Sequence, residues 1–279
     1  MPKLVQRLLI FFVGIPAVIC FIVPKVLNHL PFNFLIVFFS VLASIEMSTM
    51  LSAKGKTISK FILVPASAVL PLTAYLCGLF GWDFIFVDIV LAVVCMIIFA
   101  VEIFTEKTFE ESNHAITSGI FTVVYSGFLM TFLSRLCTFE HSVEVICLFV
   151  MLVFISDSAA WLFGMTLGKN NRGIIAASPN KSIAGFVGAY LGTIFTAILV
   201  KYFIWPQVFA QLSLIKLLIL AVCVTTAAII GDLAESVVKR SSGCKDSGQI
   251  ILGRGGALDS IDSLLAAAPF YFILLKYFI

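Results

Sequence analysis

The strongest constraint in this sequence is a series of apolar runs, each close to 20 residues long, separated by short polar segments. An α-helix needs about 20 apolar residues to cross the hydrocarbon core of a bilayer. The chain is 61% hydrophobic and only 12% charged, whereas a soluble domain is about 25% charged. We therefore predict an all-α, polytopic integral membrane protein with about nine transmembrane helices. The nine runs lie at 8–27, 32–51, 61–80, 84–104, 115–134, 143–165, 183–204, 214–233 and 261–279.

The distribution of lysine and arginine predicts the orientation. With the N-terminus in the cytoplasm, 13 of the 18 basic residues fall in cytoplasmic segments, as the positive-inside rule requires. The first run follows Lys3 and Arg7 but continues past the length of a signal peptide without an A-x-A cleavage site, which favours a retained span. We expect a cytoplasmic N-terminus and a C-terminus on the opposite side.

The chain divides into two regions by the content of its loops. Residues 1–140 hold about five spans with short connections, and residues 141–279 hold the remaining spans with two long cytoplasmic loops, 166–182 and 234–260. Both long loops are rich in glycine, serine and basic residues. We therefore expect the catalytic region in residues 141–279.

Four aspartates gather in the segment from Gly231 to Ser263. Two of them stand three residues apart at the start of the last apolar run, on one face of the expected helix. Acids at the edge of a membrane helix are costly unless they are paired or functional, and carboxylate oxygens are the ligands that Mg²⁺ prefers. The sequence predicts a Mg²⁺ site from these four residues: Asp232, Asp246, Asp259 and Asp262.

Basic residues and glycines are interleaved with these aspartates. Phosphate groups bind to lysine and arginine side chains and to backbone amides at glycine turns, so the mixture is typical of a site for a metal with a nucleotide or a diphosphate. Basic residues beside a membrane span also serve as topology signals or contacts to anionic lipids, and both interpretations stay open for these residues taken singly. The residues are Lys239, Arg240, Lys245 and Arg254.

A second polar stretch runs from Ser156 to Gly188. Asp157 lies inside an apolar run, where an acid is a functional candidate by default, although pairing with Lys181 would be a structural explanation. Lys169 follows two glycines at the end of that run. Ser178 or Ser182 either binds phosphate or caps the following helix.

These residues resemble the signature of a known family, the phosphatidate cytidylyltransferases or CDP-diacylglycerol synthases. The matching positions of its main motif are Ser236, Lys239, Arg240, Lys245, Asp246, Gly248, Gly253, Gly255, Gly256, Asp259 and Asp262. An upstream motif is similar at Asp157, Ser158, Ala160, Gly164, Gly168, Lys169, Ser178, Pro179, Lys181, Ser182 and Gly185. The two motifs stand in the family's order and cover residues 156–263.

The resemblance implies a reaction and a set of roles. CMP would pass from CTP to phosphatidate, giving CDP-diacylglycerol and pyrophosphate, for phospholipid biosynthesis. The implied catalytic residues are Asp246, Lys239, Lys245 and Asp262. The implied substrate-binding residues are Lys181, Ser178, Arg240, Arg254 and Lys169.

The resemblance also implies a cofactor and a setting. Mg²⁺, with a second cation such as K⁺ as a further expectation, would bind to the aspartates. The substrates CTP and phosphatidate and the membrane lipid are the expected partners, together with a homodimer and no nucleic acid. Because CTP is cytosolic, the active site should face the cytoplasm, and the cysteine usage favours a bacterial inner membrane.

Two other functions remain open at this point. A CTP-dependent lipid kinase of the dolichol- or phytol-kinase type would phosphorylate a lipid alcohol and release CDP. A membrane transporter would place its polar groups near mid-membrane, where only Glu46 clearly stands.

This chain departs from the family pattern at four positions: Ala184, Leu252, Arg254 and Ser260. Arg254 stands in place of a histidine and Ser260 in place of an arginine. Arg254 could therefore supply the positive charge for phosphate binding that is lost with the arginine at position 260. The variant Arg254→Ala should then lose activity in a turnover assay, and full activity in that variant would contradict this role.

Overall fold

The computed structural model describes residues 14–251 and 255–279, and it is helical. Its described part contains eight helices long and apolar enough to span a membrane: Leu30–Ser52, Lys60–Phe80, Ile85–Thr105, Ser112–Leu136, Ser142–Thr166, Ile183–Ile204, Leu214–Ser241 and Leu258–Phe278. Across these ranges there is no β-strand, only two isolated bridges. The all-α polytopic membrane fold is confirmed. The expected span at 8–27 lies partly outside the described residues, which begin within it at residue 14 and include helix α2 (Ile15–Ile22), so the count of nine stays a prediction.

The chain forms two compact units. Unit 1 comprises Met1–Thr138 and Val238–Ile261, and unit 2 comprises Phe139–Val237 and Asp262–Ile279. Unit 1 includes the segment Val238–Ile261, which comes from the sequence region 141–279. Unit 1 therefore contains part of the expected site.

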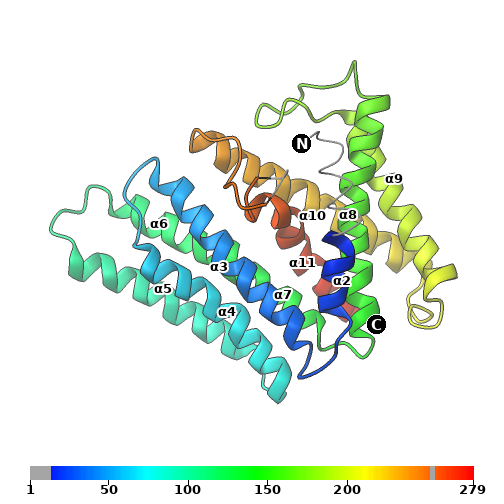
Figure 1. Cartoon of the computed structure of the whole chain (residues 1–279), viewed down its shortest axis with the longest axis horizontal. Helices are drawn as coiled ribbons and strands as arrows, with labels where there is room; N and C mark the ends of the chain where they lie inside the picture. Colours follow the sequence, from blue (N-terminus) through cyan, green and yellow to red (C-terminus); the bar gives the residue numbers. More distant parts are fainter. Residues whose placement is uncertain (1–13, 252–254) are drawn as a thin grey trace. The chain divides into compact units, whose positions relative to one another are not determined.

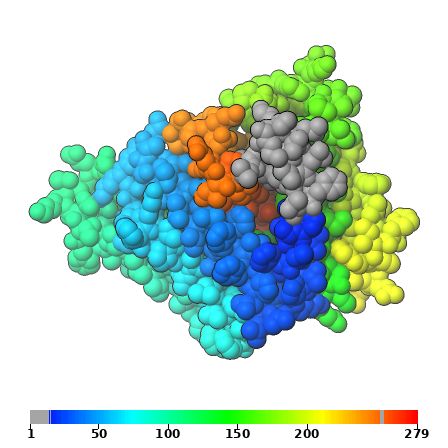
Figure 2. Space-filling model, viewed as in Figure 1, coloured from blue at the N-terminus to red at the C-terminus, as the bar shows by residue number. Residues whose placement is uncertain are grey.

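Unit 1 is built from helices that pack along their length (Figure 1). In chain order they are α2, α3 (Leu30–Ser52), α4 (Lys60–Phe80), α5 (Ile85–Thr105), α6 (Ser112–Val123), a π-helical turn η2 (Val124–Phe128) and α7 (Leu129–Leu136). Apolar side chains from α4, α5 and α6 form a common core that includes Leu63, Leu70, Val94, Ile98 and Val123. Side chains fill the spaces between these ribbons on the face shown in Figure 2.

A ladder of serines joins three of these elements. Ser44 Oγ donates to the Leu63 carbonyl at 3.3 Å, Ser67 Oγ donates to Ser44 Oγ at 3.1 Å, and Ser126 Oγ donates to Ser67 Oγ at 3.3 Å. Pro71 lies inside α4 and cannot donate to the Ser67 carbonyl four residues earlier. Gly127 packs directly on that carbonyl. Small residues at such contacts let membrane helices approach closely.

Unit 2 begins with a tight helix pair, α8 (Ser142–Thr166) and α9 (Ile183–Leu199). Glycines of α9 face α8: a Cβ at Gly188 would meet the Phe163 side chain at 2.5 Å, and one at Gly185 would meet the Ala160 carbonyl oxygen at 2.9 Å. α9 continues into the π-helical turn η3 (Val200–Ile204). These glycines therefore serve helix packing.

The helix α10 (Leu214–Ser241) is longer than expected. From the apolar pattern we expected this span to end at residue 233 and 234–260 to form a loop. The helix instead continues through Lys239 and Arg240, and α11 (Leu258–Phe278) begins three residues earlier than expected. The polar connection between them is 242–257.

We predict that Gly127→Ala destabilises unit 1. The new Cβ would lie 2.6 Å from the Ser67 carbonyl oxygen and 2.9 Å from Ser67 Cα, and overpacking against backbone costs about 1–3 kcal/mol. Thermal unfolding in detergent should show a melting temperature lowered by several degrees. Thr117→Ala, an exposed change on α6, is the control and should leave it unchanged; equal stability of both variants would contradict the packing argument.

Candidate functional site

The described parts of the polar connection, 242–251 and 255–257, fold into tight turns. Gly243 and Gly255 have φ values of +74° and +107°, a region that residues with a Cβ rarely adopt. Ile251 and Gly255 exchange backbone hydrogen bonds of 2.8 and 3.1 Å, so the two ends of 252–254 are held together. Both glycines thus meet backbone requirements of the turn, and Gly255 is one of the family-like positions.

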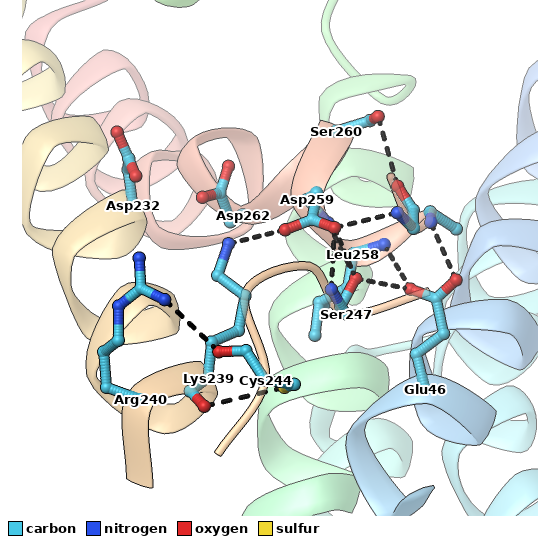
Figure 3. A network of polar contacts seen from close by, with 12 residues as sticks. Glu46, Asp232, Lys239, Arg240, Cys244, Ser247, Leu258, Asp259, Ser260 and Asp262 are labelled. Atoms are coloured by element: carbon cyan, nitrogen blue, oxygen red, sulfur yellow. Dashed lines mark hydrogen bonds and ion pairs between the residues drawn. The ribbon is translucent and has the colours of Figure 1, made fainter. Parts of the chain in front are cut away.

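Asp259, in the first turn of α11, is enclosed by donors of unit 1 (Figure 3). Its Oδ1 pairs with Lys239 Nζ at 2.5 Å. Its Oδ2 accepts hydrogen bonds from Ser247 N at 2.8 Å, Ser247 Oγ at 2.9 Å and Gly256 N at 2.8 Å. The side chains of Lys239 and Asp259 are only 12% and 6% exposed, so this is a buried pair.

Glu46, near the C-terminal end of α3, reaches the same turn. Its carboxylate accepts hydrogen bonds from Ala257 N, Leu258 N and Ser247 Oγ, each at 2.9 Å. Figure 3 shows Glu46 pointing from α3 toward Ser247 and Leu258. Ser247 Oγ therefore lies within hydrogen-bond distance of both Glu46 and Asp259 and donates its single hydrogen to one of them at a time.

Other charged residues in and next to the turn have exposed side chains. Arg240, Lys245 and Asp246 are exposed, and Arg240 donates to the Cys244 carbonyl at 3.4 Å. Asp246 lies beside Gly255, where an added Cβ would stand 3.0 Å from the Asp246 Cβ. These side chains are accessible to a soluble phosphate.

Two more of the expected residues meet in unit 2. Lys181 Nζ, from the connection between α8 and α9, forms an ion pair of 2.6 Å with Asp232 on α10. Asp262 on α11 is 7% exposed and lies within electrostatic range of Asp232, Glu235 and Asp157. A Cβ at Gly231 would meet the Asp262 carbonyl oxygen at 2.8 Å, so α10 and α11 approach closely at this level of unit 2.

The connection 167–182 is closed by backbone contacts. Arg172 and Ser182 form an isolated bridge, and Ser182 Oγ accepts from Gly185 N at 3.1 Å as the N-cap of α9. Of the two roles left open for the serines, Ser182 takes the cap. Ser178 is half-buried in the preceding turn, and Lys169 is exposed.

The expected metal ligands fit Mg²⁺ by their chemistry but are not preassembled. Within residues 14–251 and 255–279, no group of three or more His, Cys, Asp or Glu side chains is placed to hold a metal ion. All four candidates offer hard carboxylate oxygens, which suit Mg²⁺. Neighbouring acids around Asp262 repel one another, and a cation would relieve that repulsion. Asp259 would have to exchange some of its present partners to bind a metal.

Two residues that hold the turn in place were not expected to be part of the site. Ser247 carries no sequence signal of its own, and Glu46 stood out only as an acid within an apolar run. The burial of Glu46, at 4% exposure, was foreseeable, because an acid in a membrane span needs partners. Its partners lie about 200 positions later in the chain, which no local pattern reveals. Arg254, by contrast, was expected at the site but lies outside the described residues, as do Leu252 and Gly253.

Comparison with known proteins identifies the family. A sequence profile of the cytidylyltransferase family matches residues 5–278. The chain belongs to the cytidylyltransferase family. The family expected from the two motifs is thereby confirmed.

Several relatives carry the name phosphatidate cytidylyltransferase. The protein from Haemophilus influenzae is 36% identical over 131 residues, which are 47% of this chain and 45% of the relative. That from Staphylococcus haemolyticus is 33% identical over 156 residues, 56% and 57% of the two chains. That from Bacillus subtilis is 38% identical over 130 residues, 46% of each. The matched stretches span about half the length of these relatives.

We predict strong coupling between Lys239 and Asp259. Removing one partner of a buried ion pair leaves an uncompensated charge and costs about 3–5 kcal/mol, so Lys239→Met should unfold at a clearly lower temperature in detergent. The double variant Lys239→Met/Asp259→Asn should lose less than the sum of the two single variants, because the second change removes the stranded charge. Additive losses in the melting temperature would show that the pair contributes no coupling.

Proposed function

We propose that this protein transfers CMP from CTP to phosphatidate and produces CDP-diacylglycerol and pyrophosphate. The observation that carries the proposal is the combination of the family's two motifs with their geometry. Lysines meet carboxylates at Lys239–Asp259 and at Lys181–Asp232, and exposed basic residues flank the first of these pairs. The names of the relatives support the choice of phosphatidate as acceptor.

The main requirement of this reaction is the stabilisation of negative charge. A phosphate oxygen of phosphatidate attacks the α-phosphorus of CTP, the new P–O bond forms, and the bond to the β-phosphate oxygen breaks to release pyrophosphate. The nucleophile is already anionic, so no strong general base is needed. The residues must instead bring two polyanions together and stabilise the charge that develops on the leaving group.

The basic residues divide into two sets for this task. Arg240, Lys245 and Lys169 are exposed and would bind the phosphates of CTP from the aqueous side. Ser178 and Arg254, the latter on sequence grounds alone, would join them. Lys181 and Lys239 are paired with carboxylates and would be held in place near the reacting groups. Arginine and lysine both bind phosphate strongly.

Mg²⁺ is the proposed cofactor, with a second cation such as K⁺ as a further part of the proposal. Asp232, Asp246, Asp259 and Asp262 are the residues that would hold it, and they supply the oxygen ligands it prefers. When bound, a divalent cation neutralises charge on the phosphates. Asp246 and Asp262 belong to the proposed catalytic set for the same reason.

We also propose a setting for the reaction. The excess of basic residues in the inside segments favours an active site on the cytoplasmic side of a bacterial inner membrane, where CTP is present. Phosphatidate would enter from the inner leaflet. The proposed active assembly is a homodimer.

Two alternative functions differ from this proposal in their expected activity. A lipid kinase of the dolichol- or phytol-kinase type would yield a phosphorylated lipid and CDP, not pyrophosphate. A transporter would use an acid near mid-membrane, and Glu46 was the candidate. Its carboxylate binds the turn that carries the family motif, which favours the enzyme.

The test is a turnover assay on the purified full chain in mixed micelles with phosphatidate, labelled CTP and Mg²⁺. We expect a CDP-lipid with an equal amount of pyrophosphate, and we expect Asp262→Ala to reduce the rate by about 100-fold or more, because a group that stabilises transition-state charge is lost. Asp88→Asn, a change of an exposed acid on α5, is the matched control and should retain full activity. When a lipid alcohol is supplied in place of phosphatidate, a phosphorylated lipid alcohol with CDP would move the assignment to the kinase. If neither substrate gives a product, both the cytidylyltransferase and the kinase assignments are overturned.

A further inference from the structure

Glu46 is a buried acid that belongs to neither family motif. It lies on α3, a helix outside residues 156–263, and its side chain is almost completely shielded. A buried carboxylate is stable only when hydrogen bonds or counter-charges replace its water. What it binds therefore indicates what it does.

Three hydrogen-bond donors to Glu46 lie in the connection 242–257 or at the start of α11. Oε1 accepts from Ala257 N, and Oε2 accepts from Leu258 N and Ser247 Oγ. The first backbone N–H groups of a helix lack partners within the helix, and an anion is favoured there by the helix dipole. Glu46 thus caps α11 from another helix, directly before Asp259.

The glycines of the motif make room for this carboxylate. A Cβ at Gly248 would fall on the Glu46 carboxylate, and a Cβ at Gly256 would fall on both that carboxylate and Ser247 Oγ. The backbone therefore approaches Glu46 as closely as only glycine permits. Figure 2 shows the orange segment that includes residues 238–251 lying against the blue helices of the same unit.

Ser247 transmits the position of Glu46 to Asp259. Its hydroxyl contacts Glu46 Oε2 and Asp259 Oδ2, each at 2.9 Å, and its backbone N–H donates to Asp259 Oδ2. Asp259 in turn holds Lys239. A chain of charge-assisted hydrogen bonds thus runs from α3 to two residues of the proposed site.

We propose that Glu46 is the positioning residue of the motif turn. It acts through Ser247 and the N-terminus of α11 to fix Asp259 and Lys239, and it makes no contact with substrate. Its effect on catalysis rests on the proposed function, whereas its effect on the turn does not. A glutamine at this position keeps one acceptor oxygen but replaces the other with an NH₂ group, which cannot accept from Leu258 N or Ser247 Oγ.

The test compares Glu46→Gln with Glu102→Gln in the full chain. Glu102 is a matched control, because it is also a buried acid on a span of unit 1 but binds Lys56 and Ser112 away from the motif. One readout is the alkylation rate of the native Cys244, measured by mass spectrometry of its peptide. The other is kcat and KM for CTP.

We expect Glu46→Gln to speed alkylation of Cys244 by about tenfold, since charged hydrogen bonds that close the turn are lost. We expect kcat to fall by about 10- to 100-fold, as a small misplacement of catalytic groups produces, while KM for CTP changes by less than about threefold. Glu102→Gln should leave all three values near those of the wild type.

A second variant guards against a misfolded Glu46→Gln. Ser247→Ala removes only the hydroxyl link and should fold, with a loss in kcat of about 3- to 10-fold and faster Cys244 alkylation. Wild-type alkylation and kcat in either folded variant would overturn the proposal. If the wild type makes no CDP-lipid, the proposed function fails, and the alkylation rates alone still decide whether Glu46 orders the turn.

Discussion

Carboxylates beside a membrane must be surrounded by donors or cations, and this requirement organises the polar part of the structure. Asp259 is held by one lysine and two backbone N–H groups, Glu46 is held by two backbone N–H groups, and Ser247 Oγ lies within hydrogen-bond distance of both. Each lost contact would leave part of a charge unsolvated, which is far more costly near lipid than in water. Backbone N–H groups of Ser247, Gly256, Ala257 and Leu258 therefore take the place of water around these two acids.

Glycine serves two different purposes in this chain. In the motif turn, Gly248, Gly255 and Gly256 let the backbone reach the carboxylates. In the helix pair of unit 2, Gly185 and Gly188 let α9 approach α8, as small residues do between membrane helices. Gly185 of the upstream motif thus acts on helix packing, whereas Gly248, Gly255 and Gly256 of the downstream motif lie against charged groups.

The spans could be predicted well from the sequence, because apolar length is a direct physical requirement of the bilayer. The apolar pattern ended α10 too early, since charged residues from Asp232 onward interrupt the apolar run although the helix continues to Ser241. Glu235, Lys239 and Arg240 are good helix formers. The same pattern marked Lys181, Lys239 and Asp259 as polar candidates but did not reveal their pairing. Pairing depends on which helices are neighbours, and that is decided by packing between segments distant in the chain.

The carboxylates also differ in how completely they are satisfied, and this difference separates their roles. Glu46 and Asp259 already have donors on both oxygens, which fits residues that hold the turn in shape. Asp232 has a half-exposed side chain with a lysine partner, and Asp262 lies in the field of other acids. A cation gains most where negative charge is least compensated. On electrostatic grounds, Asp232 and Asp262 are therefore stronger candidates for the proposed Mg²⁺ than Asp259, whose present contacts a metal would have to replace.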